Sequence, residues 1–193
     1  MNTRSEIENR EFFNNISSSW DEHNKENYDI VFNVIELKEN DKVLDVGCGT
    51  GILDKTIYSY TKNKVVGIDI SDKMLEVAKK KNDIDDIIYI NQSFYDYNEG
   101  GFDKIIIYNA YPHFVLLEEF KEALYRNLKK EGLFLICHSL SRERLNEHHK
   151  NLSKNISRDL DNVDKEANYF VDLFDIIKAY EDDDCFYILG MKR

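Results

Sequence analysis

Short apolar runs alternate with longer amphipathic segments along most of the chain. The apolar runs cover residues 42–46, 65–69, 87–90, 102–108 and 132–137, and they are rich in β-branched and aromatic residues. Continuous runs of this kind are typical of strands that are buried on both faces of a parallel sheet. The pattern therefore predicts parallel strands with helices on both sides of the sheet.

The segments between the runs carry apolar residues at helical spacing. In residues 71–81, apolar side chains share one face behind a serine in the N-cap position. In residues 116–130, apolar side chains recur at every fourth position, and we expect further helices at residues 51–60 and 142–152. The order βαβαβ(α)βαβ predicts a doubly wound α/β domain.

The two ends of the chain depart from this alternation. Residues 174–180 and 185–191 are strand-like and are joined by a short acidic loop, which predicts an antiparallel hairpin at one sheet edge and a seven-stranded sheet. Residues 1–37 contain many aromatic and aliphatic side chains, and we expect one or two helices there. We therefore predict a single domain with an N-terminal helical cap (1–37), a ligand-binding core (38–138) and a helix followed by the terminal hairpin (139–193).

Charge and composition exclude several classes of protein. The 193 residues include 26 Lys and Arg against 37 Asp and Glu, which gives a formal net charge of −11. An acidic surface repels phosphate backbones, so we expect no nucleic-acid partner. The apolar stretches are far shorter than the ~20 residues of a membrane span, and we see no signal peptide. The 3 cysteines lack metal-ligand spacing, so we expect a cytoplasmic protein with neither a disulfide scaffold nor a metal site.

The most informative segment is VLDVGCGTG, residues 43–51, where the first strand leads into a helix. Glycine allows positive φ angles and a close approach of a ligand to the backbone. In doubly wound sheets, ligands bind beyond the carboxyl ends of the strands. A dinucleotide fingerprint would require Gly or Ala at position 52, which is Ile52, so the spacing disfavours an NAD-dependent oxidoreductase.

This loop resembles the GxGxG motif of class I S-adenosylmethionine-dependent methyltransferases, which also have an acidic residue two positions before the first glycine. The resemblance implies a Rossmann-like sheet, S-adenosylmethionine as cofactor, and cofactor contacts from Asp45, Gly47, Cys48, Gly49 and Gly51.

The second strand ends in an acidic residue that supports this resemblance. Asp69 lies 69 − 47 = 22 positions after Gly47, where a carboxylate is placed to accept the ribose hydroxyls. Ile70 and Met74 follow it as in the family's D-x-S-x-x-M-L stretch and are expected at the cofactor. NAD enzymes carry such an acid too, so the glycine spacing decides between the two cofactors.

After the third strand, the family pattern places an Asp against the adenine amino group, and here that position is Ser93. This is a departure from the family, and Asn91 or Gln92 could replace the lost contact. Phe94 is expected to flank the adenine ring. After the fourth strand, the resemblance places Asn109 beside the methionine part of the cofactor.

The histidines that follow the fourth and fifth strands, His113 and His138, are candidates for a catalytic base at the acceptor. The resemblance and the positions of these residues predict an acceptor pocket lined by Trp20, Tyr111, His113, His138, Arg142 and His149. Core packing is the alternative for Trp20, and solvent exposure on a helix is the alternative for His149. The imidazoles could also bind a metal ion, although we assign no metal site.

The function that these motifs indicate is methyl transfer from S-adenosylmethionine to a small-molecule acceptor. A nucleic-acid methyltransferase is disfavoured, because the stretch after Asn109 lacks the paired prolines of the amino-methylating enzymes and the net charge is −11. A methyltransferase that acts on a protein stays open. So does a non-catalytic protein that binds S-adenosylmethionine, for which Ser93 is the one hint. The sequence does not indicate the oligomeric state.

Overall fold

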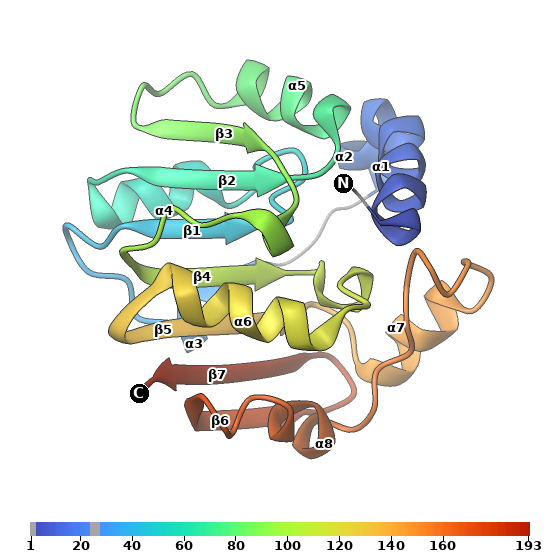
Figure 1. The fold of residues 1–193 in the computed structure, drawn as a ribbon. Helices are drawn as coiled ribbons and strands as arrows, with labels where there is room; N and C mark the ends of the chain where they lie inside the picture. The colour runs from blue at the N-terminus through green and yellow to red at the C-terminus, as the bar shows by residue number, and fades with distance from the viewer. Residues whose placement is uncertain (1–2, 24–27) are drawn as a thin grey trace.

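A seven-stranded mixed sheet forms the centre of the computed structural model, which describes residues 3–23 and 28–193 (Figure 1). The strand order is β3-β2-β1-β4-β5-β7-β6, in which β1 to β5 are parallel and β7 runs antiparallel to both of its neighbours. The strands are β1 (Val43–Val46), β2 (Val65–Asp69), β3 (Ile87–Asn91), β4 (Phe102–Tyr108), β5 (Leu128–His138), β6 (Phe174–Glu181) and β7 (Phe186–Lys192). The predicted doubly wound sheet and its antiparallel C-terminal hairpin are confirmed.

Helices cover both faces of this sheet. The α-helices are α1 (Arg4–Ile16), α2 (Trp20–His23), α3 (Asp29–Val34), α4 (Asp54–Thr61), α5 (Asp72–Lys81), α6 (Leu117–Asn127), α7 (Arg142–His149) and α8 (Val163–Asn168). Short 3₁₀ helices are η1 (Ser17–Ser19), η2 (Phe94–Asp96) and η3 (Tyr111–His113). One apolar core includes Phe120 of α6 and Ala167 of α8, and the other includes Val31 of α3 and Ile57 of α4. The two cores lie on opposite faces of the sheet (Figure 1).

Several predicted helices differ from the structure. The helix predicted over residues 51–60 begins at Asp54, and the helix predicted over residues 142–152 ends at His149. The described part of residues 1–37 contains α1, η1, α2 and α3 where one or two helices were expected. The helix predicted over residues 116–130 ends at Asn127, because Leu128 already pairs with Phe102 in the sheet. The buried Asn127 amide donates to the carbonyl oxygens of Ala123 and Tyr97, each at 2.9 Å, which holds the chain at this boundary. Between β3 and β4 the chain forms only the single turn η2.

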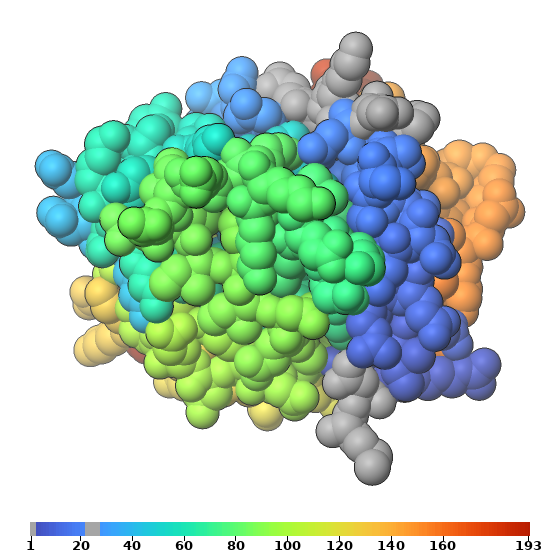
Figure 2. All heavy atoms as spheres, turned by 90° about the horizontal axis from the view of Figure 1, so that it is seen from above, coloured from blue at the N-terminus to red at the C-terminus, as the bar shows by residue number. Residues whose placement is uncertain are grey.

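The helix α1 lies across the carboxyl ends of the parallel strands (Figure 1). Near its C-terminal end, the Asn14 side chain accepts a hydrogen bond from Ser71 Oγ at 2.6 Å, next to α5. Nearer its start, the Asn9 amide donates to the carbonyl of Asn155 at 3.1 Å. In the view from above, the blue atoms of α1 lie between the green atoms of α5 and the orange atoms around α7 (Figure 2). The helix therefore bridges elements that are distant in sequence. Among the described residues, no helix is both long and apolar enough to cross a membrane.

The segment between α7 and α8 folds back over η3. Its Arg158 donates a backbone hydrogen bond to Pro112, and its guanidinium forms two hydrogen bonds of 2.8 Å to the fully buried carboxylate of Glu166. The Tyr111 hydroxyl also donates to Glu166, at 3.0 Å. The guanidinium stacks over the Tyr111 ring, with its carbon 4.6 Å from the ring centroid. This buried network holds η3 in place through Tyr111 and Pro112.

Replacing Glu166 with alanine should destabilise the fold strongly, because it leaves the Arg158 charge buried without its partner. Breaking a buried ion pair in this way costs about 3–5 kcal/mol. At about 2–4 °C per kcal/mol for a chain of this size, the melting temperature should fall by roughly 6–20 °C. The neighbouring exposed pair of Lys165 and Asp161, 2.7 Å apart, gives a control: Lys165→Ala should change stability by less than about 1 kcal/mol. Equal melting temperatures for Glu166→Ala and wild type would contradict this role of the network.

Candidate active site

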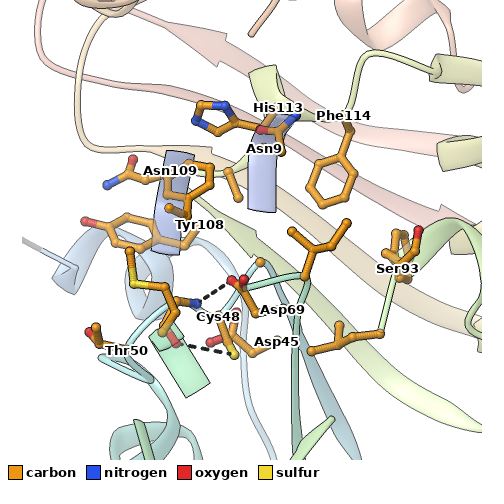
Figure 3. A pocket seen from close by; sticks show the side chains of 18 of the residues that line it. Asn9, Asp45, Cys48, Thr50, Asp69, Ser93, Tyr108, Asn109, His113 and Phe114 are labelled. Carbon is orange, nitrogen blue, oxygen red and sulfur yellow. Dashed lines mark hydrogen bonds between the residues drawn. The ribbon is translucent and has the colours of Figure 1, made fainter. Parts of the chain in front are cut away.

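A cavity opens at the carboxyl ends of β1, β2 and β4, beneath α1 (Figure 3). The residues 47–50, the turns after β2, β3 and β4, and the inner face of α1 form its walls. It encloses about 1030 Å³ of space, part of which is open to solvent.

Two glycines of the loop after β1 are required for different structural reasons. Gly47 and Gly49 both have positive φ, at 68° and 52°. A Cβ on Gly47 would lie 2.7 Å from the Cβ of Ala110, so packing against the turn after β4 requires glycine there. A Cβ on Gly49 would meet no protein atom within 4 Å. Because Gly49 lines the cavity, glycine at this position leaves space for a ligand.

Asp69, the last residue of β2, lines the cavity close to Cys48 of the glycine loop (Figure 3). Its Oδ2 accepts the backbone N–H of Gly49 at 2.9 Å, and its Oδ1 accepts the backbone N–H of Ser71 at 2.7 Å. Burial raises the pKa of this carboxyl to about 6, although the backbone hydrogen bonds oppose the shift. Each carboxylate oxygen can accept more than one hydrogen bond, so Asp69 can still bind a pair of hydroxyl groups.

A buried carboxyl pair lies under the same loop. Burial and the adjacent Asp54 raise the pKa of Asp45, and burial raises the pKa of Asp54 as well. The Tyr89 hydroxyl donates to Asp54 at 2.6 Å, and the Asn82 amide donates to Gly51 O at 2.8 Å. The raised pKa values favour protonation of one member of this pair, which removes the repulsion between two buried carboxylates. The sequence analysis did not single out Asp54, because a carboxylate in the first turn of a helix has an ordinary reading as a helix-capping charge.

The predicted cofactor residues after β2 and β3 reach the cavity: Ile70, Met74, Ser93 and Phe94 all line it. The Ser93 hydroxyl accepts the backbone N–H of Tyr95 at 3.2 Å, which caps η2. Of the two residues considered as replacements for the missing Asp, Gln92 lines the cavity. The Asn91 amide instead donates to the carbonyls of Asp69 and Ile70, at 3.0 and 2.9 Å, outside the cavity wall.

Trp20, Asn109 and His113 also line the cavity, and their roles at the acceptor and at the methionine part of the cofactor stay predictions. Asn109 has a φ of 52° and is held by Ser139, whose backbone N–H donates to its Oδ1 at 2.9 Å. Next to Trp20, Asp21 accepts a hydrogen bond from Thr50 Oγ1 at 2.6 Å, which ties α2 to the glycine loop.

His113 has a defined tautomer. Its Nδ1 lies 2.8 Å from the carbonyl oxygen of Ile156, and a carbonyl can only accept, so Nδ1 carries the proton. The lone pair is therefore on Nε2. Burial lowers the pKa of His113 to about 4, so the ring is neutral near pH 7. The Phe13 ring packs edge-on against it, with ring centroids 4.9 Å apart.

Four residues predicted for the acceptor pocket lie outside the cavity wall: Tyr111, His138, Arg142 and His149. Tyr111 is buried against Glu166 and Arg158. His138 is fully buried in β5, where burial lowers its pKa to about 3 and neither ring nitrogen has a hydrogen-bond partner among the described residues. The ends of β4 and β5 therefore differ in their surroundings. His138, the last residue of β5, is fully buried, whereas His113 lies in η3 after β4 and lines the cavity.

Arg142 and His149 are held elsewhere by their own contacts. Arg142 pairs with Glu181 of the hairpin at 3.2 Å. His149 Nδ1 lies 3.0 Å from Ser157 Oγ, and its ring centroid lies 5.1 Å from that of His113. Ile156 is hydrogen-bonded to His113, and Ser157 is hydrogen-bonded to His149, so this segment links α7 to the cavity wall. Among the described residues, no group of three or more His, Cys, Asp or Glu side chains is placed to hold a metal ion.

The cavity wall also includes residues that the sequence analysis missed, chiefly Glu6, Asn9 and Phe13 of α1 and Phe114 after η3. Glu6, Asn9 and Phe13 recur at helical spacing, so they share the face of α1 that turns inward. This spacing is visible in the sequence, but a polar stripe on a terminal helix normally indicates a solvent-exposed face.

Comparison with known families identifies the class of protein. A model described as a methyltransferase domain matches residues 37–179, well over half of the chain. The chain belongs to the methyltransferase-domain family. Its sheet order and glycine loop are those of the class I S-adenosylmethionine-dependent methyltransferases, and S-adenosylmethionine is the cofactor of this class.

The chain is similar to proteins with different acceptors. An uncharacterised protein of Methanocaldococcus jannaschii is 34% identical over 131 residues, which cover 65% of this chain and 49% of that protein. The ribosomal protein L11 methyltransferase of Thermotoga maritima is 38% identical over 96 residues, 47% of this chain and 36% of that enzyme. The sterol 24-C-methyltransferase of Clavispora lusitaniae is 33% identical over 106 residues, 52% of this chain and 28% of that enzyme. The matched segment thus spans half or less of each relative.

Solved structures share the fold over nearly the whole chain. A SAM-dependent methyltransferase from Aquifex aeolicus aligns with a TM-score of 0.75 at 19% identity, over 93% of this chain and 98% of that one. Magnesium protoporphyrin IX methyltransferase from Synechocystis, solved with bound S-adenosylhomocysteine, aligns with a TM-score of 0.74 at 16% identity, over 98% of this chain and 100% of that one. At these identities the likeness concerns the fold.

The cavity fits the cofactor of this class on its own geometry. The Asp69 carboxylate can accept further hydrogen bonds from two adjacent hydroxyl groups. The space next to Gly49 is open, and a side chain at this position would occupy it. Both features lie on one wall of the cavity, where the cofactor's ribose and methionine would be held.

Binding of S-adenosylhomocysteine should weaken as the pH falls through about 6. Only the ionised form of Asp69 accepts hydroxyl protons with both oxygens, and its pKa before binding is about 6. Above this pH the carboxylate is ready to bind, and below it affinity should fall by roughly tenfold per pH unit. Calorimetric titration between pH 4.5 and 8 measures this slope.

The variant Asp69→Asn separates Asp69 from the Asp45 and Asp54 pair, whose pKa values burial also raises. It should bind more weakly at pH 7.5 and should lose most of the pH dependence. An unchanged slope in this variant would assign the pH dependence to the carboxyl pair instead.

Proposed function

We propose that this protein transfers a methyl group from S-adenosylmethionine to a small-molecule acceptor. The observation that carries the proposal is the continuity of one cavity, which runs from Asp69 and the glycine loop to Trp20 and His113. A cofactor site and an acceptor site that share one cavity can bring the two reacting atoms together. Orientation of this kind supplies much of the catalysis of a methyl transfer, because the leaving group is already good.

The predicted cofactor residues have distinct parts in this proposal. Asp69 binds the ribose hydroxyls, and Ile70, Met74, Ser93 and Phe94 surround the adenine. The methionine part is held by Asp45, Gly47, Cys48, Gly49 and Asn109. Gly51, which the resemblance also implied at the cofactor, lies outside the cavity wall, where a Cβ would meet the Tyr89 hydroxyl. When bound, S-adenosylmethionine supplies a methyl group on a positively charged sulfur, which keeps the electron pair of the broken bond.

His113 and the aromatic side chains act on the acceptor. The neutral His113 ring presents its Nε2 lone pair, which can accept a hydrogen bond from the nucleophile and orient it toward the methyl group. Phe13, Trp20 and Phe114 supply apolar surface in the same cavity. Because α1 covers the cavity, a compact acceptor fits better than a folded protein.

Thermal unfolding in the presence of adenosyl ligands tests the cofactor assignment. A ligand at ~100 times its dissociation constant adds about 2.7 kcal/mol. At about 2–4 °C per kcal/mol for this chain length, S-adenosylhomocysteine and S-adenosylmethionine should each raise the melting temperature by roughly 5–11 °C. NAD should raise it by much less, because Ile52 occupies the position of the third fingerprint residue. A shift with NAD alone would contradict the proposal, and no shift with any of the three would remove its basis.

Turnover should depend on His113. The variant His113→Gln should lower the rate of S-adenosylhomocysteine formation by roughly 10²-fold or more, the usual contribution of a positioned acid–base group. Its affinity for S-adenosylhomocysteine should stay within about twofold of wild type, since Asp69 and the glycine loop are unchanged. The exposed His148 provides the matched control, because its substitution with glutamine leaves the cavity wall intact. Rates can be measured with a mixture of small metabolites and, separately, with ribosomal proteins as acceptors; turnover with the proteins alone would favour a protein methyltransferase.

A further inference from the structure

The inner face of α1 carries polar groups that the cofactor residues do not explain. Asn9 and Glu6 are only 5% and 6% exposed, and both lie on the cavity wall. Asn9 lies beside His113 and Phe114 (Figure 3). Polar side chains that are buried this deeply normally have complete hydrogen bonding.

The Asn9 side chain has a fixed orientation and an unpaired oxygen. Its Nδ2 lies 3.1 Å from the carbonyl oxygens of both Ser5 and Asn155. Two carbonyls can be bonded only by the NH₂ group, so the amide cannot be turned around. Its Oδ1 is buried and has no hydrogen-bond partner among the described residues. A buried acceptor without a donor is unfavourable unless a ligand supplies the donor.

The other polar groups on this wall are acceptors as well. The Ser5 hydroxyl proton is used by the Asn155 carbonyl, and the His113 Nδ1 proton is used by the Ile156 carbonyl. Glu6 accepts the backbone N–H of Thr3 through Oε2 at 2.6 Å, which leaves its other oxygen available. The polar side chains of α1 and η3 that line the cavity therefore offer Oδ1 of Asn9, a carboxylate oxygen of Glu6 and Nε2 of His113.

The charge of the cavity points in the same direction. Among the described residues that line it, the ionisable side chains include the carboxyl groups of Glu6, Asp45 and Asp69, with no Lys or Arg. A carboxylate or phosphate group placed beside Glu6, Asn9 and His113 would meet the lone pairs of these three side chains and no positively charged residue. A molecule with several N–H donors, neutral or positively charged, matches this wall.

We propose that Asn9, Glu6 and His113 form the binding site for the methyl acceptor, and that this acceptor is an amine. The proposal rests on the proposed function, since it assigns the substrate class of the same site. An amine supplies more than one N–H to the three acceptor atoms, whereas an alcohol or thiol supplies a single proton. The reacting nitrogen is a neutral amine: its lone pair forms the bond to the methyl carbon while the carbon–sulfur bond breaks and leaves its electron pair on sulfur, and the methylated ammonium then releases a proton to solvent. The Glu6 carboxylate adds a preference for a second, positively charged group of the acceptor near this nitrogen.

Two variants test the site, and their melting temperatures are measured alongside, because Asn9→Leu also removes the hydrogen bonds of Nδ2 to Ser5 and Asn155. Glu6→Gln keeps the capping box with Thr3, which glutamine also forms, and removes only the charge. Asn9→Leu removes the unpaired oxygen, and Asn15→Leu makes the same change on the exposed side of the same helix as a control. Each variant is compared with wild type for S-adenosylhomocysteine affinity and for methylation of a panel of primary amines, phenols, thiols and carboxylic acids with methyl-labelled S-adenosylmethionine.

Wild type should methylate members of the amine set. Asn9→Leu should lower kcat/KM for them by roughly 10- to 100-fold, the effect of an unpaired hydrogen-bonding group. Glu6→Gln should raise KM for amines that are positively charged, and Asn15→Leu should behave as wild type. The affinity of all three variants for S-adenosylhomocysteine should stay within about twofold, because Asp69 and the glycine loop hold the cofactor.

Other outcomes would overturn the amine site. Labelled product only from phenols, thiols or carboxylic acids, or no labelled amine from a protein that binds S-adenosylhomocysteine, would contradict the substrate class and leave the cofactor assignment standing. Loss of S-adenosylhomocysteine affinity in Asn9→Leu would show that α1 serves the cofactor. Absence of S-adenosylhomocysteine binding by wild type would instead overturn the proposed function itself.

Discussion

The carboxylate of Asp69 organises the site. It accepts the backbone N–H groups of Gly49 and Ser71, so it joins the glycine loop after β1 to the start of α5 after β2. The backbone N–H groups of Gly47 and Cys48 also donate to the carbonyl oxygen of Ile68, at 2.8 and 3.2 Å, so the loop and the end of β2 are held together at several points. Burial at this position disfavours the ionised carboxylate and raises the pKa of Asp69 to about 6. Fold and ligand binding therefore depend on the same charge.

Above this edge, the cavity is closed by segments from opposite ends of the sequence. The helix α1 contacts α5 through Asn14 and the segment after α7 through Asn9. That segment also fixes the tautomer of His113 through the Ile156 carbonyl. The network of Arg158, Glu166 and Tyr111 supports η3 from the other side. The chemistry of the acceptor side thus depends on contacts made outside the sheet.

The matched region is shared with enzymes that act on a ribosomal protein and on a sterol. In this chain the strand ends and the glycine loop form one half of the cavity wall. The other half, where we propose that the acceptor binds, is lined by residues of α1 and η3, and the segment between α7 and α8 holds these elements through Asn155 and Ile156. A wall of lone pairs without a lysine or arginine among the described residues is a property of that half.

The sequence by itself determined the sheet, the hairpin, and the cofactor wall at Gly47, Gly49, Asp69, Met74 and Phe94. These features are local: apolar runs define buried strands, and motif residues directly follow them. Only the tertiary structure decided the acceptor side. It placed His113 at the cavity, left His138 and Tyr111 in the interior, and turned Glu6 and Asn9 inward. These positions depend on the packing of segments far apart in the chain, such as Asn9 against Asn155, which no spacing within one segment encodes.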